Sequence, residues 1–161
     1  MKIDNKLDKL FGSSGSFAGY ILIVAGIFIS FSESSIFGII VTLVGLFFTF
    51  TTTGIIVEPE NTRYKFHYKF FGFIKSGSWI DLSEFKEITV MQSSLDYRTY
   101  SMTNRTTSYN QKDFRIFLLD KNHQHKIPLK KFKTKEKALS EIKDFSKFLN
   151  MAIVKYNPKN K

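Results

Sequence analysis

The residues best suited to chemistry in this sequence are two histidines and a group of carboxylates. His123 and His125 could supply two ligands to a metal ion, but no third ligand is close in sequence and the segment has the composition of a turn. Asp81, Glu84 and Glu87 are close enough for acid–base catalysis, yet they flank the start of an expected strand, where surface carboxylates are ordinary. The chain has 0 Cys, which excludes thiolate ligands and a cysteine nucleophile. These patterns favour no catalytic residue, no metal site and no cofactor.

The densest run of one charge sign is "KIPLKKFKTKEK", residues 126–137. Its lysines could contact anionic lipid headgroups, because each cation near such a surface contributes about 1 kcal/mol. A solvated surface at a strand–helix connection explains the same run equally well. The candidate lipid contacts are Lys126, Lys130, Lys131, Lys133, Lys135 and Lys137.

The charge is divided unevenly along the chain. The 161 residues carry 24 Lys and Arg against 14 Asp and Glu, a net charge of +10. Residues 1–57 hold three lysines and three carboxylates, so the whole excess belongs to residues 58–161. A nearly uncharged part followed by a strongly basic part is typical of a membrane segment joined to a water-exposed domain.

Two apolar runs make up the uncharged part, "FAGYILIVAGIFISF" at 17–31 and "IFGIIVTLVGLFFTF" at 36–50. With their small and polar flanks they extend over about 11–32 and 35–56, which reaches the roughly 20 helical residues that a bilayer core requires. The polar linker "SESS", residues 32–35, is long enough to reverse the chain. The sequence therefore predicts a transmembrane helical hairpin over residues 11–57.

Two alternatives compete with the hairpin. A soluble helical pair would need a further domain's worth of apolar surface to cover helices that are hydrophobic all round. A cleaved signal peptide would use 17–31 as its apolar region and leave the second run as a single anchor. The immediate restart at Ile36 favours the hairpin, and the lack of Asp, Lys, Arg or His within the spans disfavours a transporter.

Glycines recur seven residues apart in each run, so each pair lies on one helix face. Small residues let helices approach closely in lipid, although glycine is also common in membrane helices generally. The candidate packing residues are Gly19, Gly26, Gly38 and Gly45. Lysine and arginine precede the first span and follow the second, which predicts a multi-pass protein of the cell membrane with residues 1–10 and both termini in the cytoplasm.

The stretch "RYKFHYKF", residues 63–70, alternates cations and histidine with aromatic residues, as a strand with two different faces does. We expect Tyr64, Phe66, Tyr68 and Phe70 to face the core. Further strands are expected at 54–58, 78–82, 84–92, 113–120 and 125–132, with Pro128 restricting the last to a sheet edge. Residues 93–112 are either a long hairpin or an edge strand with a loop. An amphipathic helix follows Thr134, with its apolar stripe at Ala138, Ile142, Phe145, Leu149 and Ala152.

The block "FFGF" followed by "GSWIDL" and "EFKEITV", together with this order of elements, resembles the bacterial membrane-anchored pleckstrin-homology-like proteins. The resemblance implies an α+β fold: a two-helix transmembrane hairpin, then an antiparallel PH-like β-barrel or sandwich of about seven strands capped by a C-terminal α-helix. It also implies no enzymatic role. From the order of elements we expect a soluble domain over residues 58–152 and a flexible tail over 153–161. The basic cluster with which eukaryotic relatives bind phosphoinositides is not carried over, because the first strand connection, "VEPENTR", has only Arg63.

Together these features predict a membrane-anchored, non-enzymatic binding or scaffold module with a basic cytoplasmic domain. Its expected partners are the lipid bilayer, anionic lipid headgroups or a membrane protein. The alternative is an accessory subunit of a larger membrane complex, ahead of an enzyme or a transporter. Nucleic acid is a poor candidate partner for a domain tied to a membrane.

Overall fold

The computed structural model describes residues 2–31, 35–100 and 106–157, with only the backbone described between 95 and 111. Within these ranges the chain is α+β, with three α-helices and two sheets. It divides into two compact units. The N-terminal unit comprises residues 2–57 and 64–80, and the C-terminal unit comprises residues 58–63 and 81 onward.

The sheet of the N-terminal unit has the strand order β1-β2-β3-β4, with β5 also paired to β3. The strands are β1 (Ile3–Lys9), β2 (Thr52–Glu58), β3 (Arg63–Phe70), β4 (Ile74–Ser76) and β5 (Ile80–Asp81). A 3-10 turn, η1 (Pro59–Asn61), joins β2 to β3. Ile55 and Val57 on β2 are fully buried, and Leu7 and Tyr64 on the neighbouring strands are nearly so.

Strand β1 is an element that the sequence interpretation missed. Residues 1–10 were expected to be a simple N-terminal segment, yet Ile3 pairs with Val57 and Lys6 with Gly54 in an antiparallel ladder. The signal was present in "IDNKLDK", where Ile3 and Leu7 fall on one strand face and the charged residues Asp4, Lys6 and Asp8 on the other. Because β1 and β2 are neighbours, the two helices between them form an insertion into a β-hairpin.

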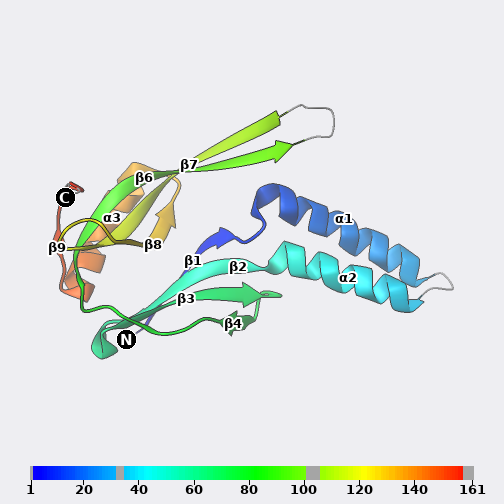
Figure 1. Cartoon of the computed structure of the whole chain (residues 1–161), viewed down its shortest axis with the longest axis horizontal. Helices are drawn as coiled ribbons and strands as arrows, with labels where there is room; N and C mark the ends of the chain where they lie inside the picture. Colours follow the sequence, from blue (N-terminus) through cyan, green and yellow to red (C-terminus); the bar gives the residue numbers. More distant parts are fainter. Residues whose placement is uncertain (1, 32–34, 101–105, 158–161) are drawn as a thin grey trace. The chain divides into compact units, whose positions relative to one another are not determined.

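Helices α1 (Gly12–Ser30) and α2 (Ser35–Phe50) form this insertion and lie side by side in Figure 1. Helix α1 is long and apolar enough to cross a membrane, whereas the apolar helix α2 is shorter. The second span was predicted to continue to residue 56, but the helix ends at Phe50 and residues 52–58 form β2. The β-branched run Thr51-Thr52-Thr53 and pairing with β1 favour a strand there. The predicted linker at 32–35 falls largely outside the described residues.

The sheet of the C-terminal unit has the order β8-β7-β6-β9. Its two central strands, β6 (Phe85–Tyr100) and β7 (Thr106–Asp120), form a long hairpin. Of the two possibilities for residues 93–112, the described backbone therefore has the long hairpin. Strand β8 (Lys126–Phe132) lies at an edge, as expected from Pro128, which has no N–H to donate to a second neighbour. Strand β9 (Ala152–Ile153) pairs in parallel with β6.

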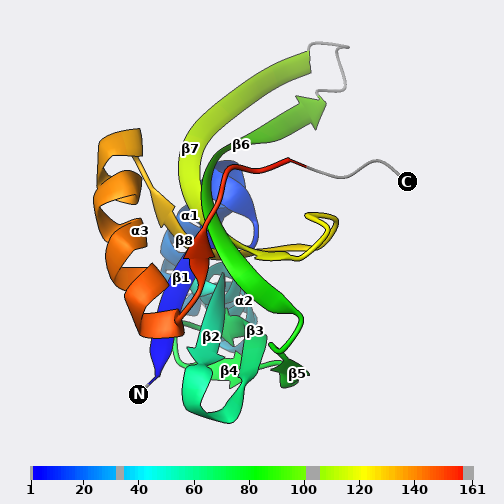
Figure 2. The same cartoon turned by 90° about the vertical axis from the view of Figure 1, so that its left-hand side faces the viewer.

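Helix α3 (Lys135–Leu149) lies along this second sheet, as Figure 2 shows. Ala138, Ile142 and Leu149 are buried on its inner face, and Phe145 is half-buried. The helix ends at Asn150, whose φ of 52° is left-handed, so the predicted stripe residue Ala152 lies beyond the helix in β9. The strands within the described ranges form two sheets, and no barrel closes among them.

The prediction that the aromatic side chains of β3 face the core is wrong in part. Tyr64 is buried, but Phe66 and Tyr68 are exposed and Phe70 is half-buried. On the opposite face His67 is buried. Alternation along a strand separates two faces correctly but does not reveal which face other elements cover.

Candidate functional site

The two predicted metal-ligand histidines have separate partners. His123 Nε2 lies 2.5 Å from Glu87 Oε2, and its ring stacks on Tyr156 with centroids 5.9 Å apart. His125 Nδ1 lies 3.3 Å from Asp120 Oδ2. Within the described parts of the chain no group of three potential ligands forms a metal site.

Of the predicted acid–base carboxylates, Asp81 and Glu87 have local structural partners. Asp81 accepts hydrogen bonds from the Ser83 hydroxyl at 2.6 Å and the Ser83 N–H at 3.0 Å, which lower the pKa of Asp81 below its ordinary value. Glu84 lines a cavity of about 460 Å³ in the C-terminal unit together with Lys86, Lys121 and Asp120. The charges of that cavity are mixed in sign, so it has no preference for a ligand of either charge.

The lysine run at residues 126–137 is not one uniform cationic surface. Lys130 forms an ion pair with Glu141 of α3, and Lys131 Nζ lies 3.1 Å from Asp113 Oδ2. Two of the six predicted lipid contacts are therefore neutralised by carboxylates. The other four are exposed: Lys126, Lys133, Lys135 and Lys137.

The four predicted packing glycines meet where α1 contacts α2. A β-carbon added to Gly26 would lie 2.9 Å from the Gly38 carbonyl oxygen, and one added to Gly45 would lie 2.8 Å from the Gly19 carbonyl oxygen. Real β-carbons essentially never approach this closely, so the helix spacing requires glycine.

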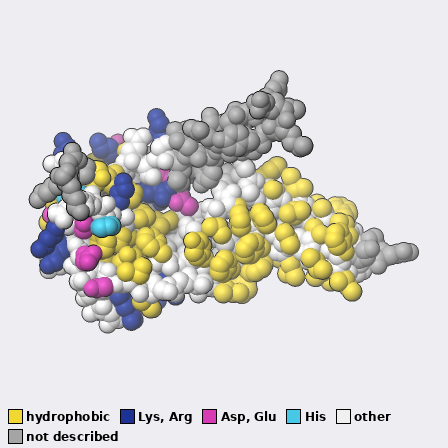
Figure 3. Space-filling model, in the orientation of Figure 1, with side chains coloured by type: hydrophobic (Ala, Val, Ile, Leu, Met, Phe, Trp, Pro, Cys, Tyr) yellow, Lys and Arg dark blue, Asp and Glu magenta, His cyan; other side chains and the backbone are white. Residues whose placement is uncertain are grey.

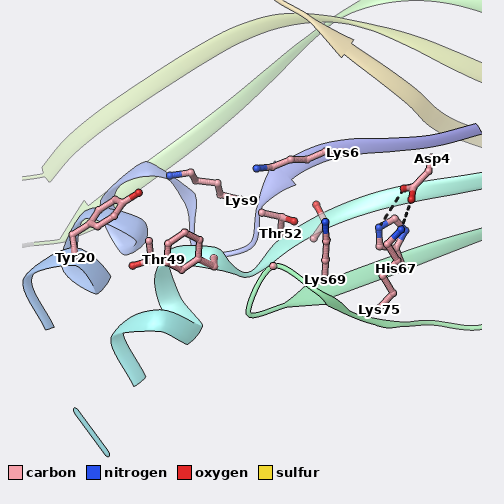
Figure 4. A pocket seen from close by; sticks show the side chains of 12 residues that line it. Asp4, Lys6, Lys9, Tyr20, Thr49, Thr52, His67, Lys69 and Lys75 are labelled. Carbon is pink, nitrogen blue, oxygen red and sulfur yellow. Dashed lines mark hydrogen bonds and ion pairs between the residues drawn. The ribbon is translucent and has the colours of Figure 1, made fainter. Parts of the chain in front are cut away.

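A more concentrated cationic site lies in the N-terminal unit, in a cavity of about 410 Å³ where the sheet meets the helix ends. We call it the junction cavity. Its sheet side carries Lys6, Lys69, Lys75, Asp4 and His67, with Lys9 at the end of β1. Its helix side is formed by Tyr20, Thr49 and Phe50 (Figure 4).

Strand geometry brings some of these charges together. Lys69 of β3 is directly opposite Lys75 of β4. Asp4 and Lys6 are two residues apart on β1 and so point to the same face. Like charges opposite each other destabilise a sheet. Lys75 donates to the Asp4 carboxylate, which offsets part of this repulsion, but four ammonium groups share this single carboxylate within the cavity lining.

His67 forms part of the cavity wall and is 4% exposed. Its Nε2 atom is 3.8 Å from Asp4 Oδ1, beyond hydrogen-bond distance, and its Nδ1 atom has no hydrogen-bond partner among the described residues. Burial is the main influence on this side chain and lowers the pKa of His67; Asp4 opposes the shift, while the neighbouring Lys75, Lys65 and Lys69 add to it. Burial therefore favours the neutral imidazole.

The sequence interpretation used Lys2, Lys6, Lys9, Arg63, Lys65 and Lys69 for orientation but missed the cavity. Lys6 and Lys69 are 63 positions apart in sequence, and only the pairing of β1 with β2 and of β2 with β3 brings them together. Comparisons with protein-family models, curated proteins and solved structures give no match for this chain.

Proposed function

We propose that this protein is a membrane-anchored, non-enzymatic binding module. In this proposal α1 and α2 cross the bilayer as a hairpin, and both sheets lie in the cytoplasm near the membrane surface. The observation that carries the proposal is the inverted distribution of side chains on the helix pair.

The residues buried in α1 are Gly12, Ser16, Gly19 and Gly26, and those buried in α2 are Gly38, Gly45 and Thr49. The large apolar side chains point outward, with Phe17 67% and Phe28 74% exposed. Figure 3 displays the resulting apolar surface over the helix pair. In water, helices bury such side chains, whereas in lipid small residues favour close helix contact and large apolar residues face the acyl chains.

The lengths of the helices are compatible with a hairpin in a bilayer. At 1.5 Å per residue, the 19 residues of α1 extend about 28 Å and the 16 residues of α2 about 24 Å. A hydrocarbon core of about 30 Å accommodates the shorter helix by local thinning at a small cost per ångström.

The pairing of β1 with β2 supports the same arrangement. The chain enters α1 from β1 and leaves α2 into β2, so both connections occur at one end of the helix pair. Lys6 and Lys9 lie on β1, which leads into α1, and by the positive-inside rule they favour a cytoplasmic location for that end.

The relationship to PH-like proteins is part of this proposal. The antiparallel hairpin of β6 and β7, followed by β8 and a helix across the sheet, supports it. A crystal structure in which the two sheets do not enclose a common core would count against a PH-like barrel.

Cysteine labelling tests the orientation. The chain has 0 Cys, so a single cysteine can be placed at Ser35, at the start of α2, or at the exposed Ser76 of β4. On intact cells an impermeant thiol reagent should label Ser35→Cys and not Ser76→Cys, and both should react after lysis. Equal labelling of both, or a chain released from membranes by alkaline carbonate, would refute the hairpin. A detergent-extracted particle containing other chains would instead favour a subunit of a larger complex.

A further inference from the structure

The junction cavity combines cationic and apolar walls. Lys6, Lys9, Lys69 and Lys75 line it from the sheet, and Tyr20 and Phe50 line it from the helices. In Figure 4, Tyr20 and Thr49 lie on the helix side, Lys6 and Lys69 on the sheet side, and Lys9 between them. Ammonium groups around a water-filled space raise the local concentration of anions, and phosphate oxygens are strong acceptors for them.

His67 is a second, independent indication of a ligand. A buried polar atom normally has a partner, and each exception requires an explanation. The His67 side chain borders the junction cavity, where a ligand with several acceptor oxygens could supply the partner that Nδ1 lacks among the described residues. Gly54 provides the space for this ring, since a β-carbon there would lie 2.7 Å from His67 Cε1.

The helix side of the cavity continues into exposed apolar surface. Tyr20, Val24 and Ile27 follow one another at helical spacing on α1, and all three are exposed. On α2 Phe50, Leu43 and Ile39 form a second exposed track at the same kind of spacing. A free anion would use only the lysines, whereas an anion attached to acyl chains would use the lysines and both tracks.

We propose that the junction cavity binds the phosphate-bearing headgroup of an anionic phospholipid, with its acyl chains lying along the exposed faces of α1 and α2. The lysines hold the phosphate oxygens, and the Tyr20 hydroxyl lies on the helix side of the cavity. This inference rests on the proposed function, because the lipid reaches the cavity only if the helix pair is in the bilayer. It differs from the predicted contacts at residues 126–137, which belong to the C-terminal unit.

The test measures phospholipid retention by the full-length protein after purification in detergent. The protein is titrated with phosphatidylglycerol or phosphatidylcholine, and bound lipid is counted by native mass spectrometry. The cavity variant is Lys6→Gln, Lys9→Gln and Lys69→Gln together. The matched control is Lys133→Gln, Lys135→Gln and Lys137→Gln together, which removes the same charge from exposed positions of the C-terminal unit.

We expect the parent to bind phosphatidylglycerol at least tenfold more tightly than phosphatidylcholine. The cavity variant should lose this preference, and the control should keep it within twofold. Replacing the three cavity lysines by arginine should restore it, which separates lost charge from failed folding. Equal losses in the cavity variant and the control would overturn the proposal in favour of diffuse surface charge.

Two further outcomes separate a phospholipid ligand from a free anion and from a protein outside the bilayer. If glycerol phosphate or inorganic phosphate displaces phosphatidylglycerol at concentrations equal to that of the lipid, the cavity is a site for a free anion and the lipid assignment is wrong. If carbonate extraction recovers the parent in the soluble fraction, the proposed function fails and the lipid ligand with it. A membrane-bound parent without lipid preference refutes the cavity proposal alone.

Discussion

Gly19 and Gly45 face each other across the helix pair, and each leaves no room for a side chain on the other. A β-carbon on Gly19 would lie 2.8 Å from the Gly45 carbonyl oxygen, and a β-carbon on Gly45 would lie 2.8 Å from the Gly19 carbonyl oxygen. This reciprocal contact sets the distance between α1 and α2. It also makes helix packing sensitive to a single methyl group.

Replacing Gly19 by Val should therefore separate the helices locally. Overpacking of this kind lowers the free energy of unfolding by about 1–3 kcal/mol. Thermal unfolding of the detergent-solubilised chain, followed by circular dichroism, should show this loss as a lower midpoint temperature. Ala18→Val is the matched control, because Ala18 is the preceding residue and is exposed. The control should change the unfolding free energy by less than about 0.5 kcal/mol. Equal effects of the two substitutions would contradict the packing role of Gly19.

Gly54 should also not tolerate alanine, because neighbouring strands of the sheet leave no space for a β-carbon there. Its added β-carbon would lie 2.7 Å from both the Asn5 carbonyl oxygen and His67 Cε1. We expect Gly54→Ala to destabilise the chain by about 1–3 kcal/mol. In the double variant Gly54→Ala/His67→Ala the contact with the ring is absent, so the combined loss should be smaller than the sum of the two single losses by at least about 0.5 kcal/mol. Additive losses would mean that the ring does not limit the space at Gly54.

The turn between β3 and β4 should reach the membrane interface. Phe71 and Gly72 have φ values of 52° and 81° in this turn, and Phe73 is 72% exposed. The Phe71 ring packs on Phe47 of α2 with centroids 5.6 Å apart, which fixes the turn beside the helix end. An exposed apolar side chain beside the end of a membrane-spanning helix is expected to contact lipid.

Tryptophan fluorescence measures the depth of this turn. The natural Trp79 lies beside Lys65 of β3. Lys65 is five residues from Phe70, at the turn end of the strand, so Trp79 is about 16 Å further from the turn. With Trp79 replaced by Phe, a tryptophan introduced by Phe73→Trp should be strongly quenched by lipids brominated near the headgroup. The parent, which carries only Trp79, serves as the control and should be quenched weakly. Stronger quenching of the parent would place the turn away from the membrane.

The C-terminal unit should lose stability at acidic pH through Asp113. This buried carboxylate accepts hydrogen bonds from Arg115 Nε at 2.7 Å and Arg115 Nη2 at 2.8 Å, and it also contacts Lys131. Burial alone would raise the pKa of Asp113, but the hydrogen bonds and charges of Arg115 and Lys131 outweigh burial and leave it below the ordinary value of 3.8. A lowered carboxylate pKa adds stability that is complete above the unfolded pKa and is lost as pH falls through the folded pKa.

The corresponding variant is Asp113→Asn. At pH 7 we expect a loss of about 3 kcal/mol, because removing the carboxylate leaves a buried cation without its counter-charge. The difference between parent and variant should shrink as the pH falls below about 4. Urea unfolding at a series of pH values measures this difference in the free energy of unfolding. The exposed Asp144→Asn is the control. A difference that stays constant down to pH 2 would show that the charge of Asp113 is not what stabilises the unit.

The sequence by itself determined the local patterns of this protein. Unbroken apolar character predicted helices at α1 and α2, glycine spacing placed Gly19 and Gly26 on one helix face, and alternation separated the aromatic and cationic faces of β3. Each of these properties follows from helix or strand periodicity, so neighbouring residues suffice to reveal it.

Only the tertiary structure decided what depends on pairing between distant segments. The alternation in β1 is short, and nothing local says that Ile3 pairs with Val57, so the strand was missed. The side chains of β3 were assigned to the core by type, yet burial depends on which other elements cover a face, and so Phe66 is exposed and His67 buried. For the same reason the junction cavity cannot be read from the sequence: Lys6, Tyr20 and Lys69 border one space only because β1, α1 and β3 come together around it.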